Sequence, residues 1–239
     1  MKRRTWVILG ATSIIAEEFA NCVASEGHSL LLIGRDKSQL AIIAANITLR
    51  YHVHCDVLVV DLAKNIDPLI KILEHQKNID LFIAHSVMLN NDQLNNNNMT
   101  ELLNANVTNT IQLIHAYWHK KQHEHRLLFI SSVAASRGRA KNSLYGASKA
   151  TIEVYLQGLQ QVASSNQQIT IARLGFIDTY VTYGEPGIFY ASPPKACAKA
   201  CWRALNAKKR CIYHPSFWGV IMGIITYLPF FIYKRMGKM

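Results

Sequence analysis

The architecture of this chain follows from one segment, Thr5-Trp-Val-Ile-Leu-Gly-Ala-Thr-Ser-Ile14. It opens with an apolar run that predicts a buried strand, and Gly10 ends that run before a helix that we expect to continue to about Glu26. Backbone amides and the helix dipole attract anions at the start of such a helix. The turn therefore predicts a site for the pyrophosphate of a dinucleotide.

The alternation of strand and helix continues to about residue 213. We expect further strands at 29–33, 53–60, 81–84, 127–131, 169–173 and 210–213. We expect helices from about 36, at 68–76, from about 100 after an Asn-rich polar loop at 90–98, at 144–163 and at 193–207. This alternation predicts an α/β fold, a single doubly wound parallel sheet of Rossmann type over residues 1–213, with ligands at the carboxyl ends of its strands. Residues 214–239 are expected to form a separate C-terminal segment, an apolar, basic helical tail.

A second informative stretch is Tyr145-Gly-Ala-Ser-Lys149, which follows an apolar run that ends at Ser132. Tyr and Lys four positions apart lie on one face of a helix, so the ammonium can approach the phenol and lower its pKa from about 10. Tyr117 and Lys121 have the same spacing, but they follow a polar segment, and Asn104 stands where Ser132 stands relative to Tyr145. The Tyr145 copy alone predicts a carbonyl-reducing site.

The order and spacing of these residues resemble the short-chain dehydrogenase/reductase family, from about residue 4 to about residue 213. The family places a catalytic Asn before its Ser and Tyr in the chain, a position that Asn106 fills. By this resemblance Asn106 holds a water in a proton relay, and Ser132 hydrogen-bonds the substrate oxygen. Tyr145 exchanges the proton, while Lys149 binds the nicotinamide ribose and tunes Tyr145. The implied reaction is reduction of a ketone or oxidation of a secondary alcohol.

The first turn departs from the three glycines that the family usually has there. Gly10 remains, whereas Ile14 and Ala16 occupy the other two positions. Ile14 is the larger change, because a β-branched residue disfavours positive φ and adds bulk where the backbone approaches the phosphates. Thr12 and Ser13 can still donate hydroxyl hydrogen bonds. We expect the cofactor to bind, with a shifted loop or a reduced affinity.

The choice of cofactor is read at the end of the second expected strand. Arg35 stands there as in NADP-using relatives, and an arginine pairs with the extra phosphate of NADP, whereas an acidic residue would bind the ribose of NAD. NADP is therefore favoured over NAD, and Asp36 is expected to cap the next helix. The resemblance also implies cofactor contacts by Asp61, Leu62, Ile177 and Thr179, in addition to Tyr145 and Lys149.

Other ionisable and thiol groups do not indicate a metal site. The five Cys residues are scattered and odd in number, which favours reduced thiols over a disulfide framework. Four histidines between positions 115 and 125 are expected to form a solvated helix end. His85 replaces an Asn that the family often has near the cofactor, and both a packing role and an acid–base role remain open for it.

The segment from Pro186 to Met239 holds nine Lys or Arg and no Asp or Glu, so it carries +9 of the net charge of +11. Within it, Ser216–Tyr233 is an uncharged, mostly apolar run that Pro229 interrupts. A helical span needs about 20 apolar residues without such a break. We therefore expect an interfacial or shallow hairpin element on an anionic membrane surface. The alternative is packing on the domain, on a substrate pocket or on a second subunit of a homo-oligomer. No nucleic acid is expected, because apolar bulk interrupts the charges.

Several segments look most similar to the reductases that complete the epimerisation of decaprenylphosphoryl ribose to arabinose. They are the opening Ile-Leu-Gly-Ala-Thr-Ser, the segment Ser131-Ser-Val-Ala-Ala-Ser-Arg-Gly-Arg139 and Tyr213-His-Pro-Ser-Phe-Trp218. The resemblance implies a keto-pentose on a polyprenyl phosphate. Another lipid-like ketone (a sterol or an acyl chain) and a dinucleotide-binding scaffold without turnover are the alternatives. A strand that begins at Thr5 leaves no room for a secretory signal, so we expect a cytoplasmic domain that is peripheral to the membrane or anchored in it.

Overall fold

The computed structural model describes residues 3–180, 182 and 188–236. Its seven strands are β1 (Thr5–Leu9), β2 (Ser29–Gly34), β3 (Cys55–Val59), β4 (Ile79–Ile83), β5 (His125–Ser132), β6 (Gln167–Leu174) and β7 (Cys211–His214). They form one parallel sheet in the order β3-β2-β1-β4-β5-β6-β7. The predicted doubly wound Rossmann fold is confirmed, and the strand order reverses its direction between β1 and β4.

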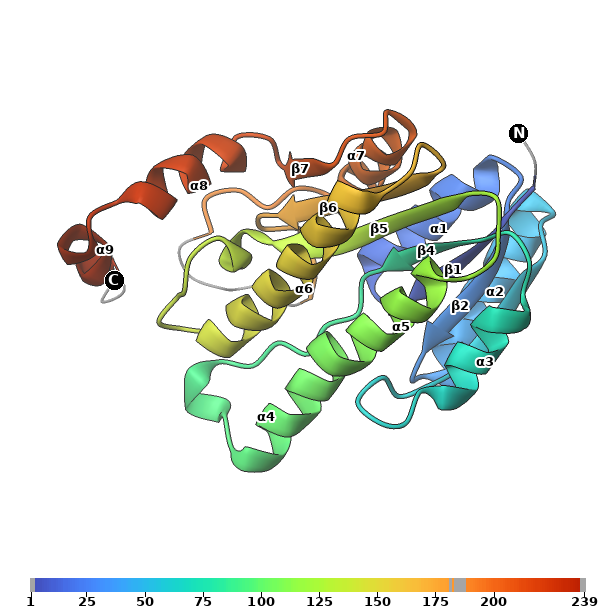
Figure 1. Cartoon of the computed structure of the whole chain (residues 1–239), viewed down its shortest axis with the longest axis horizontal. Coiled ribbons are helices and arrows are strands. Elements are labelled where there is room, and N and C mark those ends of the chain that lie inside the picture. Colours follow the sequence, from blue (N-terminus) through green and yellow to red (C-terminus); the bar gives the residue numbers. More distant parts are fainter. Residues whose placement is uncertain (1–2, 181, 183–187, 237–239) are drawn as a thin grey trace.

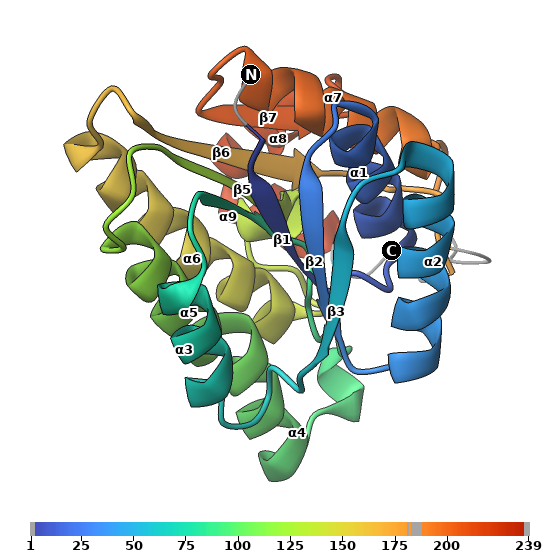
Figure 2. The same ribbon diagram turned by 90° about the vertical axis from the view of Figure 1, so that its right-hand side faces the viewer.

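Helices cover both faces of this sheet. The helices are α1 (Ile14–Ser25), α2 (Lys37–Tyr51), α3 (Asp67–His75), α4 (Asn96–Leu103), α5 (Asn109–Trp118), α6 (Ser143–Val162), α7 (Pro194–Asn206), α8 (Trp218–Tyr227) and α9 (Phe230–Met236). Helices α1, α2 and α7 lie on one face, and α3, α5 and α6 lie on the other (Figures 1 and 2). Neighbouring residues of β1 enter opposite cores, Trp6 with α1 and α7 and Val7 with α3 and α5, and both are fully buried. This two-sided burial explains the unbroken apolar run.

The turn between β1 and α1 is held by Gly10 and Ser13. Gly10 has a φ of +77°, and a Cβ there would lie 2.7 Å from the backbone of His85. The Ser13 side chain caps α1 by accepting a hydrogen bond from the Ala16 N–H at 3.2 Å. Ile14 is the first helical residue, so our expectation of strain from a positive φ is wrong for it: the cap turns the chain before Ile14 is reached. Its side chain is half exposed and lines the cavity described below.

The Asn-rich segment is partly helical, which corrects the loop expected at 90–98. Asn95 accepts hydrogen bonds from the N–H groups of Asn97 and Asn98, both at 3.0 Å, and so starts α4. A side-chain cap of this kind stabilises a helix whose own residues are poor helix formers. A π-helical turn, η2 (Asn104–Thr108), then joins α4 to α5 and contains Asn106.

Two smaller expectations concern histidine and cysteine. His125 does not belong to a solvated helix end, because it begins β5, where it is buried with its ring centroid 5.1 Å from that of Tyr117. His115, His119 and His123 are exposed, as expected. All five cysteines are free thiols.

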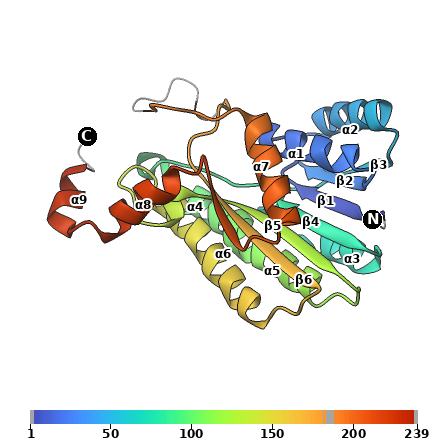
Figure 3. The same ribbon diagram turned by 90° about the horizontal axis from the view of Figure 1, so that it is seen from above.

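Residues 218–236, comprising α8 and α9 and here named the C-terminal arm, project from one end of the domain (Figures 1 and 3). The start of the arm packs on the domain, because Trp218 and Met222 are buried beside Val133. Farther along, Tyr227, Phe230 and other large apolar side chains are exposed. Among the described residues, no helix has both the length and the apolar character needed to cross a bilayer. The boundary that we place at residue 213 stays a prediction.

Candidate active site

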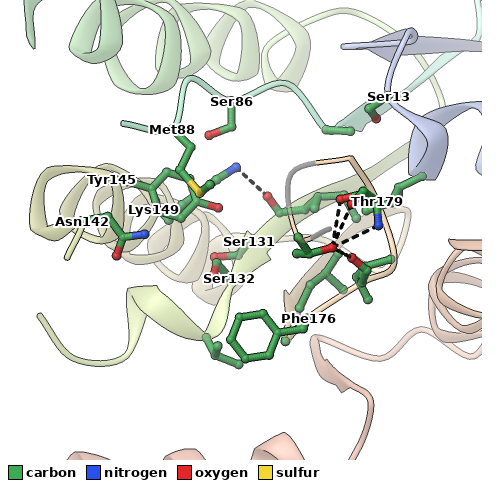
Figure 4. A pocket seen from close by; sticks show the side chains of 18 of the residues that line it. Ser13, Ser86, Met88, Ser131, Ser132, Asn142, Tyr145, Lys149, Phe176 and Thr179 are labelled. Carbon is green, nitrogen blue, oxygen red and sulfur yellow. Dashed lines mark hydrogen bonds between the residues drawn. The ribbon is translucent and has the colours of Figure 1, made fainter. Parts of the chain in front are cut away.

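A cavity of about 680 Å³ lies at the carboxyl ends of the central strands (Figure 4). Its walls come from the turn after β1, the segment after β4, the ends of β5 and β6, and the start of α6. The lining includes Thr12, Ser13, Ile14, Ser132, Tyr145 and Lys149. Three members of the predicted catalytic set therefore share one cavity with the predicted phosphate-binding turn.

Tyr145 and Ser132 are brought together by the return of the chain from β5 into α6. Ser132 ends β5, and its hydroxyl oxygen accepts a hydrogen bond from the Ala134 N–H at 3.1 Å, which keeps the side chain at the strand end. Gly146 lets α6 approach this segment closely, since a Cβ there would lie 2.6 Å from the Ala134 carbonyl oxygen. The two hydroxyl groups therefore face the same part of the cavity (Figure 4).

The pKa of Tyr145 corrects our expectation from the Tyr–Lys spacing. Burial raises the pKa of the Tyr145 phenol, against smaller lowering effects of a hydrogen bond with Ser132 and of the Arg139 charge. The sequence predicts a lowered pKa because spacing shows the ammonium but not the loss of water around the phenol. Lys149 also directs its ammonium elsewhere, to the Ile130 carbonyl oxygen at 2.9 Å.

Lys149 is a buried cation on the wall of the cavity. Burial lowers the pKa of its ammonium from 10.5 to about 7, and the nearby Glu153 carboxylate opposes this change. The ammonium nitrogen also lies 4.8 Å from the centroid of the Phe129 ring. The hydrogen bond to Ile130 therefore holds Lys149 at the end of β5, close to where a nicotinamide ribose is expected.

Glu153 is a residue of this region that the sequence did not single out. One of its carboxylate oxygens accepts a hydrogen bond from the Ser131 hydroxyl at 2.5 Å, and the other accepts two from Arg173, at 2.8 and 2.6 Å. Arg173 also donates to the Tyr213 hydroxyl at 2.7 Å. The partners of Glu153 lie in β5 and β6, far from it in the sequence. The only local signal for a role of Glu153 is its position one helical turn after Lys149.

Asn106 lies behind the cavity wall and not in it. Its side-chain oxygen accepts from the Val87 N–H at 2.7 Å, and its nitrogen donates to the Val87 carbonyl oxygen at 2.8 Å and to the Ser148 hydroxyl at 3.1 Å. Asn106 thus ties the segment after β4 to α6, the helix that carries Tyr145. Its predicted role in holding a water stays a prediction.

The second Tyr–Lys pair has a different environment. Tyr117 is fully buried, and its hydroxyl oxygen accepts from the Arg126 N–H at 2.8 Å. Burial raises the pKa of this phenol well above 10. Tyr117 therefore has a structural role between α5 and β5, which agrees with our reading of the pair as a coincidence of spacing.

The residues of the first turn fit a dinucleotide. Thr12, Ser13 and Ile14 line the cavity at the amino end of α1, where hydroxyl groups and unpaired helix amides offer donors to phosphate oxygens. Gly10 allows this turn to pack against the segment after β4. The Ile14 side chain also lies on the cavity wall, next to these donors in the sequence.

The residues at the ends of β2 and β3 fit the adenosine half of such a cofactor. Arg35 follows β2 and is exposed. Asp36 caps α2 by accepting from the Gln39 N–H at 3.0 Å, which confirms its predicted role. After β3, the amide of Asn109 holds the next segment by donating to the Leu62 carbonyl oxygen at 2.9 Å, a contact that the sequence did not reveal. Asp61 accepts a hydrogen bond from the Ala63 N–H at 3.0 Å within the same segment.

The segment after β6 forms the opposite wall. Ile177 is buried and Thr179 lines the cavity. The Thr179 N–H donates to the Thr182 hydroxyl at 3.1 Å. Gly175 must be a glycine here, because a Cβ would overlap the indole of Trp218. The C-terminal arm therefore contacts the turn after β6 directly.

His85 lies between the cofactor turn and η2. Its Nε2 atom lies 2.8 Å from the Thr110 hydroxyl and 3.1 Å from the Ala105 carbonyl oxygen. Burial lowers the pKa of His85 to about 4, with a smaller contribution from the charge of Lys149. A neutral, hydrogen-bonded imidazole favours the packing role over the acid–base role.

Comparison with known proteins identifies the family. Residues 4–185 match the short chain dehydrogenase family. The chain therefore belongs to that family and is an oxidoreductase with a nicotinamide dinucleotide cofactor. It is similar to an uncharacterised oxidoreductase of Staphylococcus epidermidis, with 27% identity over 77% of this chain and 82% of the relative. It is also similar to the 11-beta-hydroxysteroid dehydrogenase-like 2 protein of Arabidopsis thaliana, with 29% identity over 88% of this chain and 73% of that protein.

Solved structures show the same fold at low sequence identity. A bulky-bulky ketone specific alcohol dehydrogenase from Comamonas testosteroni superposes with a TM-score of 0.79 at 20% identity, over 96% of each chain. A short-chain dehydrogenase from Sphingobium yanoikuyae in complex with NADPH superposes with a TM-score of 0.75 at 21% identity, over 95% of this chain and 96% of that one.

Proposed function

We propose that this protein is an NADP-dependent reductase of a lipid-linked ketone. The observation that carries the proposal is the convergence of Ser132, Tyr145 and Lys149 on one cavity that also contains the turn after β1. A proton donor, a second hydroxyl and a cation at the carboxyl ends of parallel strands are the groups that carbonyl reduction requires.

Side chains of this protein would donate the proton that the carbonyl oxygen takes up. Tyr145 keeps its proton at neutral pH because burial raises the pKa of the phenol, and it gives that proton to the carbonyl oxygen as negative charge develops there. The Ser132 hydroxyl, on the same side of the cavity, hydrogen-bonds this oxygen. Bound NADPH would supply the hydride to the carbonyl carbon. The ketone C=O thus becomes a secondary alcohol, with one hydride on carbon and one proton on oxygen.

Arg35 supports NADP over NAD. It follows β2, where the adenosine ribose of a dinucleotide lies in this fold, and its guanidinium is exposed to pair with a 2′-phosphate. Asp36 is occupied as a helix cap, since its carboxylate accepts from Gln39 at 3.0 Å and from the Ser38 hydroxyl at 2.6 Å. The Oδ1 atom of Asp36 is therefore engaged at the start of α2.

The C-terminal arm supports a substrate at a membrane surface. Its outer part exposes Ile224, Tyr227, Phe230 and Phe231, and α9 ends with Lys234 and Arg235. Exposed apolar side chains next to cations suit the interface of an anionic bilayer. A keto-pentose on a polyprenyl phosphate combines an anionic group with an apolar chain. The name of the Arabidopsis relative keeps a sterol ketone as the second candidate.

The test is a titration of the protein with NADPH followed by a panel of ketones. NADPH should bind, and its absorbance should fall only when a ketone is added, with prenyl-phosphate keto-sugars reduced faster than free sugars. A faster reduction of sterol ketones would support the second candidate. NADPH binding without turnover on any ketone would make the protein a dinucleotide-binding scaffold.

A further inference from the structure

The cavity carries an excess of positive charge. Arg139, Lys141 and Lys149 line it, whereas no Asp or Glu is among its described lining residues. Reduction of a neutral ketone needs one of these cations, Lys149, whose ammonium already donates to Ile130. Arg139 lies in the segment that leads into α6.

Arg139 lines the cavity from the segment that leads into α6. Asn142, a little later in the same segment, lies with Tyr145 on the side of the cavity away from Ser13 (Figure 4). Arg139 and Tyr145 line the same cavity, and the charge of Arg139 makes a small contribution that lowers the pKa of Tyr145 against the larger effect of burial. Arg139 is exposed, and its side chain forms no hydrogen bond or ion pair with any residue that the structure describes. Its donors are therefore available to a ligand.

The C-terminal arm holds the backbone just before Arg139. Arg137 donates to the carbonyl oxygens of Ile225 at 2.5 Å and Leu228 at 2.8 Å, at the end of α8. The Tyr233 hydroxyl donates to the Gly138 carbonyl oxygen at 2.5 Å, and the Tyr233 ring centroid lies 3.9 Å from the Arg137 guanidinium carbon. These contacts place the C-terminal arm beside the segment that carries Arg139.

We propose that Arg139 is a specificity-determining residue that binds a phosphate group carried by the substrate close to its reacting ketone. A guanidinium matches two phosphate oxygens at once, which a neutral ketone cannot offer. This inference rests on the proposed reductase function and narrows its substrate class to phosphorylated ketones. The adjacent arm would contact the apolar chain when the phosphate is esterified to a lipid.

The experiment compares paired ketones with and without phosphate. Dihydroxyacetone phosphate and dihydroxyacetone serve as small probes for the NADPH-loaded protein and for Arg139→Gln, Arg139→Lys and the control Arg203→Gln, an exposed arginine of α7. We expect Arg139→Gln to raise KM for the phosphorylated ketone about tenfold, equivalent to about 1.4 kcal/mol, and to leave KM for the neutral ketone within about twofold. For Arg139→Lys, KM for the phosphorylated ketone should lie between the wild-type and Arg139→Gln values, because lysine keeps the positive charge but cannot donate two parallel hydrogen bonds as a guanidinium does. Equal effects on both ketones, or no effect, would overturn the proposal.

A binding readout separates this inference from the reductase function. NADP-loaded protein is titrated with geranyl phosphate, inorganic phosphate and geraniol. Arg139→Gln should weaken both phosphates, and geranyl phosphate should bind more tightly than inorganic phosphate if the apolar chain meets the arm. If wild-type protein reduces no ketone but loses phosphate binding in Arg139→Gln, the reductase function fails and the anion site stands. If Arg139→Gln binds both phosphates as tightly as the wild type, Arg139 does not bind phosphate, whether or not the protein reduces ketones.

Discussion

The ammonium of Lys149 donates a hydrogen bond to the Ile130 carbonyl oxygen at 2.9 Å, so the cation is tied to the end of β5 and not to the phenol of Tyr145. This contact lies in a buried environment that lowers the pKa of Lys149 to about 7. This geometry separates a cofactor-binding role for Lys149 from a proton-donating role for Tyr145. In the proposed reaction Lys149 would bind the ribose of the cofactor, while Tyr145 would keep the proton until the carbonyl oxygen takes it.

The lowered pKa of Lys149 predicts a pH dependence of stability. Between about pH 7 and the ordinary lysine pKa of 10.5, the unfolded chain binds a proton that the folded chain does not. The free energy of unfolding should therefore rise with pH over this window in the cofactor-free protein. Denaturant titrations at several pH values should show this rise in wild type and a flatter dependence in Lys149→Met. Identical pH dependence in both proteins would contradict the assigned pKa.

Glu153 should act on Lys149 through its charge. The carboxylate raises the pKa of Lys149, so Glu153→Gln should lower that pKa further below about 7. If the ammonium form supports catalysis, the alkaline loss of kcat/KM should move to lower pH in Glu153→Gln, while Glu101→Gln, an exposed change on α4, should keep the wild-type profile. A uniform drop in kcat/KM at all pH values would indicate a structural role alone.

Arg35→Ala tests the cofactor preference. The substitution removes a charge-assisted contact that only NADPH can make, so the Kd for NADPH should rise about tenfold or more while the Kd for NADH changes little. Fluorescence titrations with both cofactors measure the two constants, and Arg50→Ala on α2 is the control. Equal losses for NADPH and NADH would show that Arg35 does not contact the phosphate.

The outer part of the C-terminal arm should bind anionic vesicles. Phe230 and Phe231 are 72% and 67% exposed, and each buried aromatic side chain contributes roughly 2 kcal/mol. The pair Phe230→Glu and Phe231→Glu should therefore abolish co-sedimentation with phosphatidylserine vesicles, and high salt should weaken binding of the wild type without abolishing it.

Matched substitutions on the domain control for the added charge. Ile42→Glu with Leu49→Glu introduces the same charge on exposed positions of α2 and should leave vesicle binding unchanged. Point changes are preferable to deletion of residues 215–239, because that deletion would remove the buried Trp218 and Met222. Wild-type protein that remains in the supernatant, or a variant that changes oligomeric state instead, would assign this surface to a subunit contact.

The sheet could be predicted because parallel strands that are buried on both faces appear as continuous apolar runs, such as Thr5–Leu9. The Ser132, Tyr145 and Lys149 positions could be predicted for a related reason. Ser132 ends β5, and Tyr145 and Lys149 lie on the first turns of α6, so local spacing brings all three to a single cavity.

Features that depend on distant partners could not be predicted. Glu153 is defined by Ser131 and Arg173, which reach it from β5 and β6. The raised pKa of Tyr145 depends on burial by several segments, which the local spacing of Tyr and Lys does not report. The polar composition of residues 90–98 led us to expect a loop, and the sequence alone did not show that Asn95 caps α4.

In the proposed reaction Tyr145 delivers the proton to a ketone oxygen. The most direct measurement is the single-turnover rate of NADPH oxidation by Tyr145→Phe with a reducible ketone, beside the NADPH affinity of the same variant. We predict a rate at least about a hundredfold lower, the usual scale for loss of a general acid, with NADPH affinity within about threefold of wild type. Tyr117→Phe is the matched control: it loses a buried hydrogen bond and about 1 kcal/mol of stability, but should keep the wild-type rate. A near-normal rate in Tyr145→Phe would show that Tyr145 does not deliver this proton.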